Sequence, residues 1–235
     1  MIDFTGVKAL TIPEGSVKKI TRKSDGALIW EKSTGRLPSA YQEVEWIQAA
    51  ANVGAHINLG FSYDTKAIVN LGQGILNDNT AYIFGAAENS GKLRCMISSP
   101  YGSAVTAYHS TSTNYVATAV GYNKGIINHI KVSWETGNLC IENLTTGKKA
   151  TKQDVASYTM SSPLYLFAQN YNGSTRYGDT RRIAFFQYYD KNNTLICDLV
   201  PCYRKSDGVI GMYDLITNKL FTNVGTGSFT RGADV

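Results

Sequence analysis

The last forty residues constrain the fold of this chain more than any other part of it. Short apolar segments within residues 199–214 and 218–229 alternate there with turns of two or three residues. Gly and Asn recur at the turns, where the backbone must reach positive φ. Because a helix cannot continue through such frequent turn signals, this region predicts the closing hairpins of an antiparallel β-sandwich. A sandwich of this kind is more often a scaffold for binding and assembly than a site of chemistry.

The region from residue 37 onward shows the same pattern of short strands. Segments with alternating apolar and polar residues predict half-buried strands. They are residues 43–48, 55–61, 80–85, 93–97, 127–134 and 139–142. Residues 163–168 show no alternation and predict a central strand covered on both faces, whereas residues 182–189 and 194–200 predict a hairpin around residues 190–193. Many short strands at near-regular spacing predict a sandwich or barrel, and no helix longer than two turns is predicted.

Residues 1–32 predict a separate small β-module. Three short strands are predicted at residues 7–12, 17–23 and 27–30, and Ser24-Asp25-Gly26 predicts a tight hairpin turn before the last. Three short strands bury little surface by themselves, so we expect this module to pack on a partner or on a copy of itself. The alternative is an extra hairpin packed on the sandwich. Residues 33–36 predict a short polar linker.

Composition excludes several classes of function. The net charge is +5, but no run of Lys and Arg exceeds two residues, so the clustered basic face that nucleic acid needs is not predicted. No apolar run approaches 18 residues, and the N-terminus lacks the basic start and apolar core of a signal peptide. We therefore expect no membrane insertion. Four cysteines are predicted as buried free thiols, with two disulfides as the alternative: Cys95, Cys140, Cys197 and Cys202.

No motif of a catalytic site stands out. Retaining glycoside hydrolysis needs two carboxylates about 5 Å apart, which alternate positions on one strand can supply. The nearest approximation is Glu43-Val44-Glu45. The three histidines are isolated from one another and from acidic neighbours, so no zinc site is predicted. We therefore expect a protein that is not an enzyme and carries no cofactor.

Calcium is the one metal for which the chain offers candidate ligands. Asn77, Asp78 and Asn79 form a compact segment rich in side-chain oxygens. Asn and Asp are also the commonest turn residues, so a plain turn is the alternative and no metal site is assigned.

Two segments carry the groups that bind sugars. An exposed aromatic ring suits the apolar face of a sugar, and planar amide, carboxylate or guanidinium groups suit its hydroxyls. The first segment is a predicted loop with Tyr171, Asn172, Arg176, Tyr177 and Asp179. The second segment contains Tyr108 and Tyr115. The alternative is a hydrated loop whose tyrosines pack on the rim of the sandwich.

Several of these segments together carry a resemblance. Residues 200–202, 208–214 and 221–227 follow an opening at residues 37–47 and a pair of strands that includes residues 182–190. This arrangement resembles a concanavalin A-like (laminin G-like) jelly-roll domain of bacteriophage and prophage structural proteins, over roughly residues 37–232. Residues 12–31 are similar to short β-segments that precede a variable C-terminal domain in phage tail and virion-appendage proteins.

The resemblance implies an all-β protein with three parts. These are an N-terminal attachment and oligomerisation β-module (1–32), a linker (33–36) and a concanavalin A-like jelly-roll domain (37–235). Homotrimers are common among phage appendages, so the resemblance implies a homotrimer. The apolar side of the first strands would bury Phe4, Val7, Leu10 and Ile12.

The function that the resemblance implies is structural and adhesive. It implies a virion protein, either a tail or baseplate receptor-binding component or a head decoration fibre. The jelly roll would bind a host-surface glycan or protein, and the N-terminal module would bind other virion proteins. Such a protein is assembled in the bacterial cytoplasm and ends on the virion surface. The alternatives are a decoration protein without a ligand and a glycoside hydrolase on the same fold.

Overall fold

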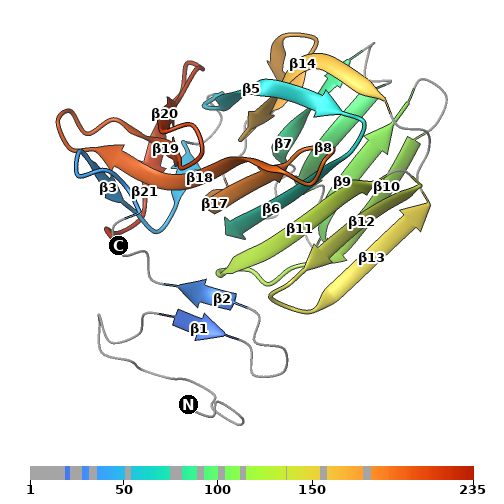
Figure 1. Cartoon of the computed structure of the whole chain (residues 1–235), viewed down its shortest axis with the longest axis horizontal. Coiled ribbons are helices and arrows are strands. Elements are labelled where there is room, and N and C mark those ends of the chain that lie inside the picture. Colours follow the sequence, from blue (N-terminus) through green and yellow to red (C-terminus); the bar gives the residue numbers. More distant parts are fainter. Residues whose placement is uncertain are drawn as a thin grey trace.

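The computed structural model describes two stacked β-sheets and a separate hairpin (Figure 1). It describes residues 19–21, 28–31, 36–50, 54–74, 81–88, 93–99, 104–111, 115–135, 137–153, 158–176 and 181–235. All regular structure in these ranges is β, without a helix, so they contain no helix that could cross a membrane. The predicted all-β sandwich is confirmed.

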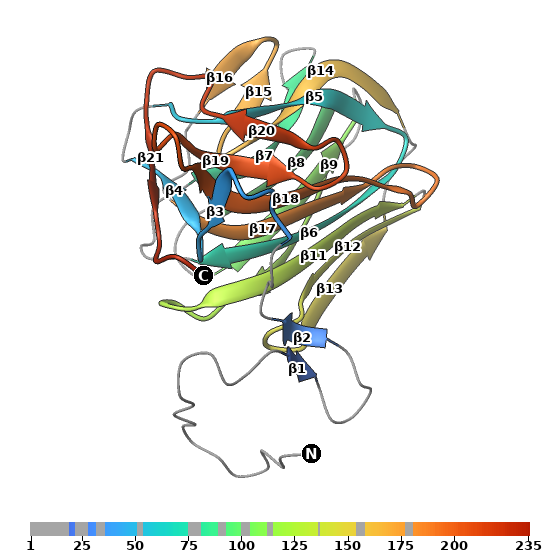
Figure 2. The same ribbon diagram turned by 60° about the vertical axis from the view of Figure 1, so that its left-hand side comes forward.

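The smaller sheet has the strand order β10-β9-β8-β7-β14-β5. Its strands are β5 (Ile57–Asp64), β7 (Ala81–Glu88), β8 (Leu93–Ser99), β9 (Ala104–Ser110), β10 (Tyr115–Gly121) and β14 (Thr159–Leu166). A short hairpin of β15 (Gln169–Tyr171) and β16 (Ser174–Arg176) joins this sheet, because β15 pairs in parallel with β7. Figure 2 shows this hairpin and β14 together at one end of the molecule.

The larger sheet has the strand order β13-β12-β11-β6-β17-β18-β19-β20. These strands are β6 (Ala67–Gly74), β11 (Ile127–Glu135), β12 (Asn138–Asn143), β13 (Lys148–Gln153), β17 (Arg182–Tyr189), β18 (Leu195–Arg204), β19 (Ile210–Asp214) and β20 (Lys219–Thr222). Three short strands join them, namely β3 (Tyr41–Glu43), β4 (Ile47–Ala49) and β21 (Phe229–Arg231). Antiparallel pairing of β17 with β18, β18 with β19 and β19 with β20 confirms the predicted closing hairpins.

Large aromatic side chains fill the space between the two sheets. Phe84 of the smaller sheet contacts Phe186 of the larger one, with ring centroids 5.3 Å apart. Trp134 is fully buried, and its Nε1–H donates to the Tyr108 carbonyl across the interface at 2.9 Å. The residues from Leu164 to Ala168 are all buried, which confirms the prediction of a covered central segment.

Residues 43–48 form two short strands instead of the predicted one. β3 pairs with β18, whereas β4 pairs with β17 and β21. The chain changes neighbours between them, where Val44 makes an isolated bridge with Asp234. Val44 also donates its N–H to the Pro201 carbonyl of β18, and the chain then moves on to β17 and β21.

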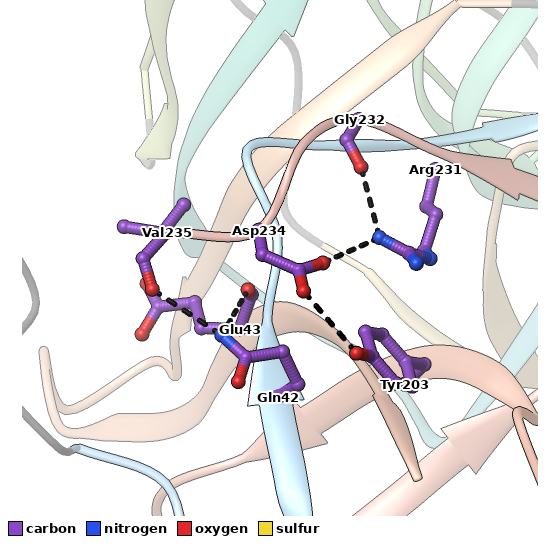
Figure 3. Close-up of polar contacts among 7 residues, drawn as sticks. All are labelled: Gln42, Glu43, Tyr203, Arg231, Gly232, Asp234 and Val235. Carbon is purple, nitrogen blue, oxygen red and sulfur yellow. Dashed lines mark hydrogen bonds and ion pairs between the residues drawn. The ribbon is translucent and has the colours of Figure 1, made fainter. Parts of the chain in front are cut away.

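Polar contacts tie the C-terminal segment to β3 and β18 (Figure 3). The guanidinium of Arg231 lies 4.3 Å from the Tyr203 ring centroid and donates to the Asp234 carboxylate. That carboxylate also accepts from the Tyr203 hydroxyl at 3.2 Å. Gln42 donates to the carbonyl of Val235 at 3.3 Å. These contacts hold the end of the chain against the sandwich.

The N-terminal region is described only in part. β1 (Lys19–Thr21) pairs with β2 (Leu28–Glu31) in antiparallel fashion as a separate two-stranded sheet. The predicted strand at residues 7–12 lies outside the described residues. So do the predicted oligomerisation residues, Phe4, Val7, Leu10 and Ile12. The division at residues 32 and 36 therefore stays a prediction.

All four cysteines are free thiols. Cys95, Cys197 and Cys202 are buried, and Cys140 is half-buried in β12. Burial raises the pKa of the Cys202 thiol to about 12 and that of Cys197 further still, which keeps both thiols protonated and inert.

Candidate ligand-binding face

The outer face of the smaller sheet collects candidate residues from distant parts of the chain. Along β9, Val105 and Ala107 belong to the core. Because successive side chains alternate between faces, Tyr108 points outward. On β8, Cys95 belongs to the core, so Arg94 points outward by the same rule.

The β15–β16 hairpin adds Tyr171 to this face. Tyr171 is in register with Ala87 of β7, and Ala87 is in register with Arg94 of β8. Directly paired residues share a face, and neighbouring strands lie about 4.8 Å apart. Tyr171 and Arg94 are therefore about 10 Å apart with the small Ala87 between them. Gly85, the residue two before Ala87 in β7, lies on the same face.

The segment predicted as a sugar-binding loop is a β-hairpin for most of its length. Asn172 and Gly173 form its two-residue turn, with φ of 50° and 84°. Two positive φ values are what a tight type I′ hairpin needs, and Asn-Gly is its strongest sequence signal. The prediction of a loop at residues 170–176 was wrong because Asn172-Gly173 turns the chain tightly enough for residues 169–171 to pair with residues 174–176.

The hairpin brings two of the predicted sugar-binding residues together. The guanidinium carbon of Arg176 lies 3.3 Å from the centroid of the Tyr171 ring. The stack covers one face of the ring, so a sugar cannot stack on that face while Arg176 occupies it. Tyr171 is therefore half-buried with one face of its ring under Arg176, and the exposed group of the pair is the guanidinium.

The structure describes only some of the other candidate sugar-binding and calcium-binding residues. Tyr108 is half-buried on the same face. Tyr115 begins β10 and pairs with Ser110, but its side chain is outside the described part. The remaining candidates also lie outside the described residues, namely Tyr177, Asp179, Asn77, Asp78 and Asn79. Among the side chains that the structure does describe, no group of three or more His, Cys, Asp or Glu could hold a metal ion.

Buried amides anchor the hairpin from beneath. The fully buried Asn170 donates to the Pro163 carbonyl at 2.8 Å and accepts from the Gly173 backbone N–H at 2.8 Å. The buried Gln169 donates to the sulfur of Met96 at 3.1 Å. These bonds fix the turn and the start of the hairpin to β14 and β8.

His56 supports the second strand of the hairpin. Its Nδ1 lies 2.9 Å from the Gly54 carbonyl, which can only accept, so Nδ1 carries the proton. In the neutral ring Nε2 then accepts from the Thr175 hydroxyl at 3.4 Å. The ring also stacks on Tyr165 with centroids 4.5 Å apart. Sequence reasoning assigned no role to His56, because Thr175 and Tyr165, the side chains that it contacts, lie more than 100 residues away.

The Asn-Val-Gly-Thr-Gly segment that carries the resemblance holds His56 in place. The side-chain oxygen of Asn223 accepts from the His56 backbone N–H at 3.0 Å. The side-chain amide nitrogen of Asn223 donates to the carbonyls of Gly225 and Gly227. A Cβ on Gly225 would lie 1.9 Å from the Gly54 carbonyl oxygen, so only glycine fits. The motif is therefore a structural clamp next to the candidate face.

The acidic residues of the smaller sheet are occupied. Its described strands contain only two, Asp64 and Glu88. Asp64 pairs with Lys191 at 2.6 Å. Glu88 accepts from the Ser161 backbone and hydroxyl at 2.8 and 2.9 Å and from the Ser162 backbone.

Glu43 and Glu45, the nearest approximation to a carboxylate pair in the sequence, do not lie on one strand. Glu43 ends β3 and pairs with Arg36 at 2.8 Å. Glu45 lies exposed between β3 and β4. Among the described residues, neither this pair nor the acids of the smaller sheet resemble the two facing carboxylates of a glycosidase.

Glu88 leads to a prediction for acid stability. Burial opposes its ionisation, but the hydrogen bonds from Ser162 and Ser161 outweigh this effect and lower its pKa from the ordinary 4.5. The stabilisation that ionised Glu88 gives to the folded state is complete at pH values above 4.5. It is lost as the pH falls through the lower pKa that Glu88 has in the folded state. On acidification, we expect the free energy of unfolding of wild type to fall by about 0.5 kcal/mol more than that of Glu88→Gln. The effect is small because solvent screens the carboxylate. Urea denaturation at neutral and acid pH measures this difference; equal losses would contradict it.

Comparison with known proteins supports the fold alone. No protein-family model and no curated protein matches the chain. The native heptameric SAP-like pentraxin from Limulus polyphemus is similar, with a TM-score of 0.52 and 11% identity over 81% of this chain and 95% of that chain. Domains LG4-5 of the mouse laminin α1 chain give a TM-score of 0.53 and 10% identity over 77% of this chain, which spans 50% of that fragment.

A phage protein is also among the similar structures. Tailspike protein 2 of the Escherichia coli O157:H7 bacteriophage CAB120 gives a TM-score of 0.41 and 10% identity, over 67% of this chain and 27% of that one. This likeness is too weak to carry an argument. The pentraxin and the laminin domains show that the present chain has the concanavalin A-like jelly-roll fold.

Proposed function

We propose that this chain is a non-enzymatic adhesion protein of a phage virion, which binds a host-surface glycan or protein through the outer face of its smaller sheet. The observation that carries the proposal is the stack of the exposed Arg176 on Tyr171 at that face, on which Tyr108 also lies. The sequence resemblance over residues 37–232 supports the virion assignment, as a tail or baseplate component or a head fibre.

The proposal includes the absence of catalysis and of a cofactor. Each acid in the described strands of the smaller sheet is engaged by Lys191 or by serine donors, which disfavours acid–base work there. A glycoside hydrolase and a ligand-free decoration protein remain the alternatives. Calcium at residues 77–79 stays a prediction.

We also propose that the N-terminal module assembles the protein into a homotrimer and attaches it to other virion proteins. The apolar side chains expected on its first strand support this assignment. The protein would be assembled in the cytoplasm of the host bacterium and displayed on the virion surface, without contact with nucleic acid and without membrane insertion.

A glycan array with the full chain tests the adhesive function. We expect binding to at least one bacterial wall polysaccharide, weakened about tenfold or more by Tyr171→Ala, because the change removes the aromatic surface and releases Arg176. Tyr189→Ala, on the larger sheet, is the matched control and should bind as wild type does. An array without any binding would favour the decoration protein, and release of cleaved sugar would favour the hydrolase.

A further inference from the structure

Arg176 differs from four other arginines of the described residues. Arg36, Arg204 and Arg231 form ion pairs with nearby acids, and Arg182 donates to Gln48. The side chain of Arg176 is exposed at the end of β16, and no hydrogen bond or ion pair joins this side chain to any residue in the described part. Its five side-chain N–H donors therefore have no partner among the described residues.

The stack on Tyr171 fixes the direction of these donors. With the guanidinium carbon 3.3 Å from the ring centroid, the ring covers one face of the guanidinium plane. The N–H groups lie in that plane, so they point along it and not into the ring. A planar fork of this kind binds a carboxylate or a phosphate through two parallel hydrogen bonds. The contact with the Tyr171 ring restricts the side chain, which lowers the conformational entropy that binding costs.

The backbone under the stack is also held in place. Asn170 fixes the turn, and the contact of Thr175 with His56 fixes the strand that carries Arg176. The two described acids of the smaller sheet, Asp64 and Glu88, already have partners. No described carboxylate of this sheet is left to neutralise Arg176.

We propose that the ligand of this face is an anionic glycan, one that bears carboxylate or phosphate groups, and that Arg176 is its anion-binding residue. This inference rests on the proposed function, because it names the ligand class for the same face. The Arg176 fork binds the anionic group, and Tyr171 holds the fork in position.

Binding of three polymers to the full chain tests the inference. Polygalacturonate offers carboxylates, poly(glycerol phosphate) offers phosphates, and dextran is neutral. We expect at least one anionic polymer to bind more tightly than dextran, with an affinity that falls as salt is added. Arg176→Gln should weaken this binding about 10- to 100-fold. Arg176→Lys should restore only part of it, because an ammonium group lacks the planar fork.

Controls separate the ligand class from the adhesive function. Arg204→Gln removes an exposed, ion-paired arginine from the larger sheet and should leave binding unchanged. Equal binding of dextran and the anionic polymers, or unchanged affinity in a folded Arg176→Gln variant, would overturn the inference. If neutral glycans bind, and Tyr171→Ala abolishes the binding while Arg176→Gln does not, the adhesive function is supported and the anionic ligand class is rejected. Absence of binding to all polymers and to the array rejects both.

Discussion

Gly85→Ala is expected to lower the free energy of unfolding by about 2 to 5 kcal/mol. Gly85 lies in β7 with a φ of +132°, a conformation that L-residues rarely adopt. A Cβ there would lie 2.2 Å from the Cys95 carbonyl oxygen and 2.5 Å from the Met96 Cβ. Because one of these neighbours is backbone, the clash is relieved only by moving β8 away from β7.

The effect of Gly85→Ala should extend to the candidate face. Met96 is in register with Tyr108 and accepts the hydrogen bond from Gln169, so a shift of β8 disturbs both hairpins. Gly60→Ala is the matched control, since Gly60 has a φ of +76° and nothing within 4 Å of its added Cβ. We expect the control to cost only about 1 to 2 kcal/mol. Urea denaturation measures both variants, and equal losses would show that the close packing at Gly85 is unimportant.

Trp134→Ala should destabilise the sandwich by about 3 to 5 kcal/mol. Trp134 is fully buried in β11 and contacts Phe84 of the opposite sheet, with ring centroids 6.2 Å apart. Truncation would leave a large cavity between the sheets and remove the hydrogen bond to the Tyr108 carbonyl. The loss should appear as a lower urea midpoint with a similar m-value.

Trp134→Phe separates the packing of Trp134 from its hydrogen bond. This variant keeps most of the apolar volume and loses the donor to Tyr108, so we expect a cost of about 1 to 2 kcal/mol. If Trp134→Ala and Trp134→Phe lose the same stability, the cavity contributes little and the hydrogen bond dominates.

Local signals in the sequence were enough for the class of fold. Turn residues at short intervals predicted strands, and the β17–β18 hairpin around residues 190–193 is confirmed. The single strand at residues 43–48 was wrong, because β3 and β4 take different neighbours from distant parts of the chain. The loop predicted at 170–176 was wrong because Asn172-Gly173 is a hairpin turn.

The candidate site could be predicted only where its residues are close in sequence. Tyr171 and Arg176 lie five positions apart, so one hairpin turn brings them together. Tyr108 joins their face through the registers of β9, β8, β7 and β15, which no local pattern specifies. The support from His56 and Asn223 depends on an even longer separation.

The amino-acid sequence by itself determined that the chain forms short strands with frequent turns, because backbone preferences and alternation of apolar residues act over a few residues. Only the tertiary structure decided which strands are neighbours, which face Tyr171 and Arg94 share, and that Arg176 covers the Tyr171 ring. Pairing between strands depends on contacts between residues far apart in the chain, and a shift of one residue would move every side chain to the other face.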